Sequence, residues 1–291
     1  MTEPAYALEP RPEPLGPDSL WYRVGLPRTL LLLAGRPLLL QVCHPVIGAG
    51  VRDFSVFRQD PWGRLDRSVT SLELQIFGGR RAIEESDRLR TMHREIKGTG
   101  FNGERYSALH PGAYAWTHLS TFDTILKMAD LVGYSGIQPR HHERLYAEWR
   151  QVGLVLGIKD HHMPENISDL HDYVNGMVTR ELGGNETAYN LLDTLALRDV
   201  PPPAGLPGPV WQALKPFGAT VLHDFTVGTL PPHLREELGL EWTRKDQVRL
   251  TLMAKAVHTV SPGVPGKLMQ YPLAYEATRA ARNYRTAGSS A

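Results

Sequence analysis

Apolar residues recur at spacings of three and four along most of the chain, which is the period of an amphipathic α-helix. No pair of alternating apolar runs is joined by an Asn-Gly or Asp-Gly turn, the pattern typical of a β-hairpin. The sequence therefore predicts an all-α fold. The predicted helices cover residues 28–43, 64–77, 80–97, 112–132, 139–156, 168–182, 185–197, 209–227, 231–238 and 245–259.

Proline and glycine divide this pattern. Gly98 and Gly133 follow periodic segments and are expected to end helices, where a left-handed residue is favoured. The Pro-rich run over 199–209 cannot be helical and predicts a surface connection inside one domain. We expect a flexible Pro-rich leader over 1–20, one helical domain over 21–285 and a disordered tail over 286–291.

Composition narrows the class of protein. The chain has 291 residues, is 42% hydrophobic and carries a net charge of +1, which is ordinary for a globular protein and offers no field for nucleic acid. The single Cys43 excludes an intrachain disulfide. The acidic leader is unlike a secretory signal, and Arg36 and Pro37 interrupt the longest apolar run well before it could span a membrane. We expect a cytoplasmic protein.

His93 lies in an apolar stripe with Leu89, Met92 and Ile96, at spacings that place the four side chains on one helix face. An imidazole that points into the interior requires a partner. The residues leave two interpretations open. His93 is either a core histidine bonded to a carbonyl or water, or an axial ligand of haem iron, which uses a neutral imidazole in a dry pocket.

Two other groups have polar side chains on helix faces. His118 shares a stripe with apolar residues of the helix predicted after that of His93, where it is either a bonded core residue or a support for a site. Arg64, Arg67 and Ser68 form a cationic and hydroxylic side of an earlier helix. That side is either a solvated, ion-paired face or a surface that holds haem propionates and donates hydrogen bonds to bound dioxygen.

Spacing excludes other kinds of site. No histidine follows a Glu or Asp by three residues, so the pairs of a di-iron bundle are absent. No two histidines are four residues apart, which excludes the zinc-protease helix. The adjacent pairs His141-His142 and His161-His162 diverge on a helix and are interpreted as surface or loop residues. No Gly-x-Ser-x-Gly elbow is present.

Short motifs in a fixed order resemble the rubber oxygenase (latex-clearing protein) and MpaB-type oxygenase family. The likeness extends from Trp21 to Arg282. The motifs are Ala34-Gly35-Arg36, His44-Pro45, Ala49-Gly50-Val51, Phe54-Ser55, Arg64 to Ser68, Phe77-Gly78, Met92-His93, Tyr106-Ser107-Ala108, Trp116-Thr117-His118 and Leu230-Pro231-Pro232.

The resemblance implies a globin-like core that holds haem b and an enzyme that cleaves isoprenoid double bonds with dioxygen. Met92-His93 corresponds to the family's proximal motif, so the resemblance implies His93 as the iron ligand. It also implies a position for His118 beside the cofactor. Asp53 precedes the Phe54-Ser55 motif and is a candidate acid or base; the other interpretation is an exposed carboxylate at a helix end.

The chain departs from the family at the distal motif. Latex-clearing members have Arg-x-x-Lys-Thr, whereas this chain has Arg64-Leu65-Asp66-Arg67-Ser68. A guanidinium stays protonated and is a poor iron ligand. We therefore expect Arg67 to donate hydrogen bonds or to bind a propionate, and the departure argues against polyisoprene as the substrate.

These observations predict a haem b-dependent oxygenase that oxidises a hydrophobic small molecule with dioxygen, including cleavage of an alkene or isoprenoid. In this hypothesis His93 binds iron. Arg64, Arg67, Ser68 and Asp53 are the candidate catalytic groups, and His118 contacts the cofactor with the two arginines. The alternatives are a haem-dependent peroxidase or dehydrogenase of a biosynthetic pathway, a non-catalytic haem-binding protein, and a helical interaction protein without a cofactor.

Overall fold

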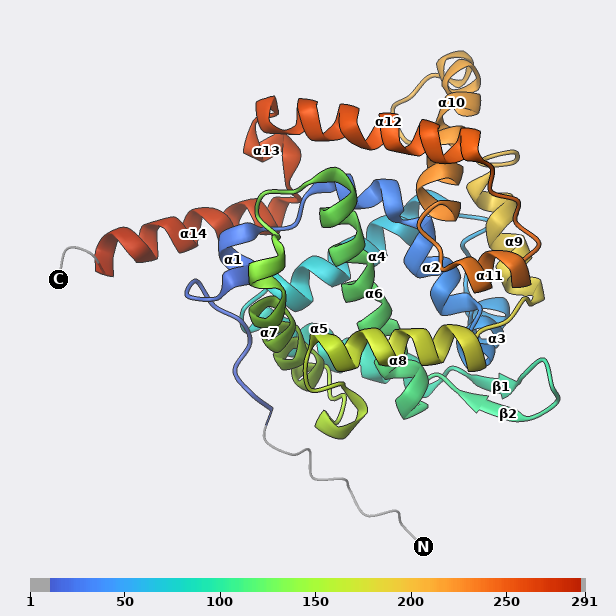
Figure 1. The fold of residues 1–291 in the computed structure, drawn as a ribbon. Coiled ribbons are helices and arrows are strands. Elements are labelled where there is room, and N and C mark those ends of the chain that lie inside the picture. The colour runs from blue at the N-terminus through green and yellow to red at the C-terminus, as the bar shows by residue number, and fades with distance from the viewer. Residues whose placement is uncertain (1–10, 289–291) are drawn as a thin grey trace, which may run out of the picture.

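The computed structural model describes residues 11–288, and within them helices account for nearly all regular structure (Figure 1). One two-stranded antiparallel sheet is the only sheet in this part of the chain. The prediction of an all-α fold is therefore confirmed. Residues 1–10 of the expected leader and 289–291 of the expected tail lie outside the described residues.

The elements, in chain order, fall into three kinds. The α-helices are α1 (Leu20–Val24), α2 (Gly35–Val42), α3 (Pro45–Phe54), α4 (Pro61–Phe77), α5 (Arg81–Arg94), α6 (Pro111–Val132), α7 (His142–Val155), α8 (Ile167–Arg180), α9 (Glu186–Leu195), α10 (Gly208–Val227), α11 (Pro232–Glu237), α12 (Arg244–Val260), α13 (Gly266–Met269) and α14 (Pro272–Gly288). The strands are β1 (Lys97–Thr99) and β2 (Arg105–Ser107). The 3-10 helices are η1 (Arg28–Leu33), η2 (Pro139–His141), η3 (Asp160–His162) and η4 (Ser261–Gly263).

Helix α6 forms the centre of the bundle, with α2, α7 and α12 packed around it (Figure 1). Most of its residues are buried, because the helix is apolar on nearly all sides. The predicted stripe that contains His118 is buried along its whole length, from Phe122 to Val132. The helix ends at Gly133, whose φ of 64° is the left-handed conformation expected there.

A buried ion pair ties α2 to this central helix. Arg36 is 4% exposed, and its guanidinium lies 2.6 Å from the Asp123 carboxylate. It also donates to the Thr124 hydroxyl at 2.9 Å and to the Thr229 carbonyl at 3.0 Å. A charge in a core is tolerated only when it is paired and hydrogen-bonded, as it is here.

Carboxylates from distant helices cap the helices near both ends of the described chain. Glu148 of α7 accepts hydrogen bonds from the backbone N–H groups of Leu20 and Trp21 in α1. Glu73 of α4 is buried and accepts from the N–H groups of Leu273 and Ala274 in α14. These bonds satisfy backbone donors that a helix cannot satisfy itself.

Residues 11–18, for which we expected a flexible leader, lie against the body of the protein. Leu15 is buried within the main hydrophobic cluster. Arg11 forms an ion pair of 2.7 Å with Asp87 of α5. The backbone carbonyl of Glu13 accepts a hydrogen bond from Gln151.

Four α-helices, α1, α3, α13 and α14, and one hairpin were not predicted. Helix α3 contains Gly48 and Gly50, which weaken the helical signal; Gly48 is required because a Cβ there would lie 2.4 Å from the Val42 carbonyl oxygen. Helix α14 is rich in alanine, and its small side chains pack against α1 and α4. The predicted helix over 80–97 instead ends at Arg94, and the chain then turns into β1.

The β1–β2 turn shows why the hairpin was missed. Its turn holds Asn102-Gly103, a hairpin dipeptide, but no alternating apolar runs flank it. Gly103 has a φ of 82°, and the Asn102 side chain accepts from the Glu104 N–H. The spacing Gly98-x-Gly100-x-x-Gly103 joins two antiparallel strands here, whereas a dinucleotide-binding loop joins a strand to a helix.

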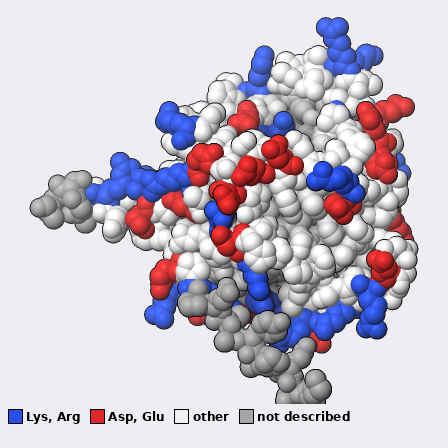
Figure 2. All heavy atoms as spheres, turned by 60° about the horizontal axis from the view of Figure 1, so that its bottom comes forward, with Lys and Arg blue, Asp and Glu red and all other residues white. Residues whose placement is uncertain are grey.

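Charges of both signs are interspersed over the face shown in Figure 2, in agreement with the small net charge. None of the helices within residues 11–288 combines the length and the hydrophobicity needed to cross a membrane. Cys43 is buried.

Replacing Arg36 tests the buried ion pair. Arg36→Ala leaves the Asp123 carboxylate without its partner and is expected to lower the free energy of unfolding by about 3–5 kcal/mol. Urea denaturation followed by circular dichroism measures this change. Asp160→Asn, which removes the partner of Arg150 in a pair whose carboxylate side chain is 67% exposed, is the control and is expected to cost less than about 1 kcal/mol. Equal losses of unfolding free energy in the two variants would contradict the assignment of Arg36 and Asp123 as a buried, stabilising ion pair.

Candidate functional site

Helices α4 and α5 pack along each other and bring the predicted histidine opposite a predicted arginine. His93 lies in the last turn of α5 and is half-buried. Its ring meets that of Tyr114 edge-on, with centroids 5.7 Å apart. Among the described residues, no group forms a well-aligned hydrogen bond with its buried Nδ1 atom.

The surroundings hold the His93 ring neutral. Burial lowers its pKa below the ordinary value, and the positive charges of Arg64 and Arg88 lower it further. The Leu89 carbonyl, one helical turn earlier, acts in the opposite direction and raises the pKa. Because Nδ1 is turned toward the protein, Nε2 is the nitrogen left to face outward. A neutral ring with one free nitrogen is what a metal ion requires of histidine.

The three distal candidates on α4 do not act together. The Arg64 guanidinium donates a short hydrogen bond to the Ser68 hydroxyl, which in turn donates to the Arg64 carbonyl at 2.9 Å. Arg64 is exposed like Arg67, and partial desolvation by the surrounding protein together with the nearby charge of Arg67 lowers the pKa of Arg64. Arg67 itself forms an ion pair of 3.1 Å with Asp60, and both side chains are more than half exposed.

Helix α6 leaves one face uncovered next to His93. Thr117 is exposed although its neighbours Trp116 and His118 are buried, and Tyr114 and Thr121 on the same face are only half-buried. We call Tyr114, Thr117 and Thr121 the open face of α6. The exposed Thr117 shows that no other described element covers this part of α6.

Gln41 of α2 borders this open face from the other side. Its amide nitrogen lies 3.3 Å from the Thr117 carbonyl and 3.3 Å from the Thr121 hydroxyl. Gln41 of α2 thus contacts the open face of α6, and His93 of α5 meets the same face at Tyr114. Gln41 and Thr121 were not among the predicted site residues. The signal that could have indicated this face is the pair Thr117 and Thr121, four residues apart in an otherwise apolar helix.

His118 lies inside the core and not on the open face. Its ring stacks on Trp149 at 4.6 Å, and Nε2 lies 2.9 Å from the Trp149 carbonyl. The Trp149 indole donates back to the His118 carbonyl at 3.2 Å. Burial lowers the pKa of His118 to about 4, so the ring is a neutral donor to that carbonyl. Its bonding partners come from α7.

Asp53 closes the junction between α3 and the hairpin. Its carboxylate accepts hydrogen bonds from Arg52 at 2.7 Å and from the Tyr106 hydroxyl at 2.7 Å. These bonds lower its pKa, and burial and the carboxylate raise that of Tyr106 to about 12. Gly98 is needed beneath this contact because a Cβ would lie 2.9 Å from the Tyr106 ring.

The apolar stripe around His93 is less buried than expected. Met92 is 44% exposed, and Leu89 and Ile96 are only half-buried. The reason is that α5 ends at Arg94, so its last turn is covered by protein on one side only. The exposed thioether adds apolar surface beside the imidazole.

Residues 21–259 match the family described as ER-bound oxygenase mpaB/B′/rubber oxygenase, catalytic domain. The chain belongs to this family. The match covers both α4 and α5, and it establishes an oxygenase-type catalytic domain as the context of the site.

Two curated relatives show how far sequence similarity to this chain extends. An uncharacterised protein of Mycobacterium bovis and one of Mycobacterium tuberculosis are each 22% identical over 245 residues. Each alignment covers 81% of this chain and 90% of the relative. No solved structure matches this chain.

The residues beside His93 fit a haem better than a bare metal ion. No three His, Cys, Asp or Glu side chains within residues 11–288 gather into a group that would hold a metal by themselves. A porphyrin supplies four of the iron's ligands, so the protein need supply only one. His93 offers that nitrogen, and the Arg64 guanidinium offers a donor on the facing helix.

The pKa of His93 tests its proximity to Arg64. Arg64→Gln removes a positive charge that disfavours the imidazolium, so the pKa of His93 is expected to rise. An NMR titration of the imidazole proton at Cε1 measures it. Arg67→Gln removes the same charge from an exposed ion pair and is expected to have the smaller effect. A larger shift of the His93 pKa in Arg67→Gln than in Arg64→Gln would show that Arg67, and not Arg64, is the arginine nearer to His93.

The buried His118 predicts acid lability. Its pKa is about 4 in the folded protein and near 6.5 in the unfolded chain, so the unfolded chain binds the extra proton between these values. The free energy of unfolding therefore falls as pH falls through this window, by about 1.4 kcal/mol per pH unit for one proton. His118→Gln retains a donor for the Trp149 carbonyl and is expected to flatten the slope. Denaturant titrations across the window measure it, with exposed His233→Gln as the matched variant.

Proposed function

We propose that this member of the mpaB/rubber oxygenase family is a haem b-dependent oxygenase that oxidises a hydrophobic small molecule with dioxygen. The observation that carries the proposal is the neutral His93 ring, which faces Arg64 next to the open face of α6. The family match supports the reaction class. Haem b as the cofactor and a hydrophobic small molecule as the substrate are proposed from the residues around His93.

His93 would hold the haem through Nε2. Its Nδ1 nitrogen is buried, and the Leu89 carbonyl one helical turn earlier is the acceptor available to the ring, which would favour the tautomer with a free Nε2. Edge-on contact with Tyr114 restricts ring rotation. When bound, the haem supplies one-electron and dioxygen chemistry that no side chain can supply.

Arg64 and Ser68 would serve the distal side. The guanidinium is a permanent cation with several donors, and its bond to the Ser68 hydroxyl one turn along α4 restrains it. Such preorganised donors stabilise negative charge where it develops. Arg67, where the latex-clearing pattern has lysine, remains on the solvent side with Asp60; we propose a propionate contact there at most.

An apolar substrate suits the side chains near these groups. Leu65, Val69 and Leu72 of α4 and Leu89 of α5 are half-buried, and Met92 is exposed. Val69, Leu72 and Leu89 pack against the main hydrophobic cluster, so apolar surface continues from the core to these groups, as is typical of a small-molecule site. We propose His118 and Asp53 as positioning residues that hold α6 against α7 and α3 against the hairpin.

Haem content tests the proposal. After haem-supplemented expression, the wild-type protein is expected to bind about one haem and to show a Soret band that shifts on reduction with carbon monoxide. His93→Ala is expected to lose most of the haem, whereas His141→Ala, in η2, is expected to retain it. Pyridine haemochrome and iron assays measure both. Equal retention in the two variants would disprove His93 as the ligand, and a wild-type protein that takes up no haem would disprove the cofactor.

Isotopic labelling separates the oxygenase from the alternatives. Incorporation of label from ¹⁸O-labelled dioxygen into the product of an apolar alkene is expected for an oxygenase. An oxidised product without label indicates a peroxidase or dehydrogenase. Haem binding with no turnover of any substrate indicates a carrier.

A further inference from the structure

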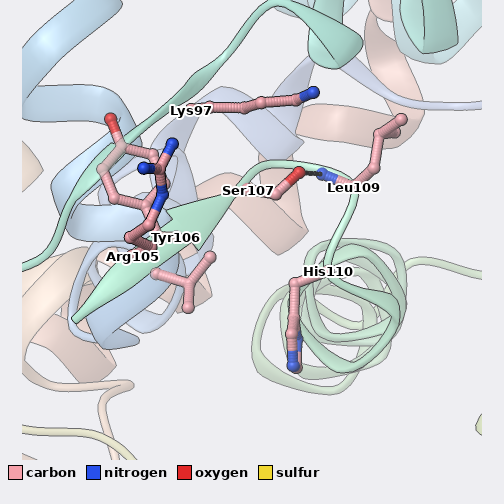
Figure 3. Close-up of a pocket in the computed structure, with 7 residues that line it drawn as sticks. Lys97, Arg105, Tyr106, Ser107, Leu109 and His110 are labelled. Carbon is pink, nitrogen blue, oxygen red and sulfur yellow. Dashed lines mark hydrogen bonds between the residues drawn. The ribbon is translucent and has the colours of Figure 1, made fainter.

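A hollow lies beside the hairpin, apart from the α4–α5 contact. This pocket of about 390 Å³ is formed where β1 and β2 meet the first turn of α3 and the start of α6 (Figure 3). Its volume is within the range of small-molecule sites. Its lining consists of Val46, Lys97, Arg105, Tyr106, Ser107, Leu109 and His110. We call it the hairpin pocket.

The lining carries positive charge with nothing to balance it. Lys97 and Arg105 both line the pocket, and no Asp or Glu does. In the strand register Lys97 is opposite Ser107, and Arg105 is two residues from Ser107, so the three side chains share one face of the hairpin. Within residues 11–288, neither cation forms an ion pair or a side-chain hydrogen bond.

Two further donors are aligned by backbone contacts. The Ser107 hydroxyl accepts from the Leu109 N–H at 3.3 Å, which leaves its own proton free to donate (Figure 3). His110 caps α6, and its Nδ1 accepts from the Ala113 N–H at 3.4 Å. A neutral ring that accepts at Nδ1 carries its proton on Nε2 and is therefore a donor there.

The hairpin is held rigidly enough to keep these donors in place. The Tyr106 hydroxyl bonds to Asp53, and Arg52 donates both to that carboxylate and to the Thr99 carbonyl. Strand β2 is thereby fixed to α3 from the face opposite Lys97 and Arg105. Donors that are fixed before a ligand arrives lose little entropy on binding.

We propose that the hairpin pocket binds the oxyanion group, phosphate or carboxylate, of a small molecule, with Lys97 and Arg105 as charge partners and Ser107 and His110 as neutral donors. Arginine matches two oxygens of such a group at once, and lysine contributes a point charge. The proposal does not depend on haem binding at His93.

Calorimetric titration with inorganic phosphate and, separately, with succinate tests the pocket at neutral pH and constant ionic strength. Saturable binding of one ligand per chain is expected. Lys97→Gln/Arg105→Gln is expected to weaken binding by at least about tenfold, because two charge-assisted contacts are lost. His110→Asn retains a residue that caps helices well but removes the Nε2 donor, and is expected to weaken binding by about threefold.

The matched control is Lys127→Gln/Lys255→Gln, which removes the same net charge from two exposed positions outside the pocket. It is expected to bind like the wild type. Tighter binding of phosphate assigns a phosphorylated ligand, and tighter binding of succinate assigns a carboxylate. Absence of saturable binding for both probes, or equal weakening in the two double variants, overturns the proposal. His93→Ala is expected to bind both probes like the wild type, which separates this outcome from failure of the haem proposal.

Discussion

The ion pair between Arg36 and Asp123 is the constraint on which the arrangement of the other helices depends. A buried guanidinium has no stable position except against its carboxylate, so the pair fixes how α2 lies on α6. Gln41 is five residues further along α2, and this placement lets its amide reach Thr117 and Thr121. The same contact therefore secures the core and defines one border of the open face.

Arg67 and Ser68 are adjacent in the distal motif, but their side chains lie in different environments. Successive residues on a helix point about 100° apart, so Ser68 meets Arg64 while Arg67 turns to Asp60 and solvent. In the pattern of latex-clearing members, lysine stands at the position of Arg67. Here that position carries a permanent cation in an exposed ion pair, which is consistent with a different task for this part of the helix.

Periodicity predicted most helices because their apolar faces are continuous. It also found His93 and His118, since an imidazole inside an apolar stripe stands out whatever its role. The same pattern could not tell that His118 stacks on Trp149 in the core whereas His93 is half-buried against Tyr114, because that difference depends on which helices cover each ring. Tertiary packing, and not local sequence, therefore determines that His118 is buried and His93 only half-buried.

The parts that sequence reasoning missed have short or weakened local signals. Strands of three residues cannot show alternation, so Asn102-Gly103 alone did not indicate a hairpin. Gly48 reads as a helix breaker, yet it allows α3 to approach the end of α2. Exposure of Thr117 inside an apolar helix was equally invisible, because it arises from an absent neighbour and not from the residue.

The carboxylate caps on α1 and α14 have a consequence for how the chain folds. Glu73 is 200 residues away from Leu273, and Glu148 is 128 residues away from Leu20. These bonds cannot form until α4 and α7 are in place, so neither terminal helix is completed by local interactions. Contacts of such separation raise the contact order and slow folding. The caps of α1 and α14 thus depend on α4 and α7 being in place, so the two ends of the described chain are coupled to the middle of the bundle.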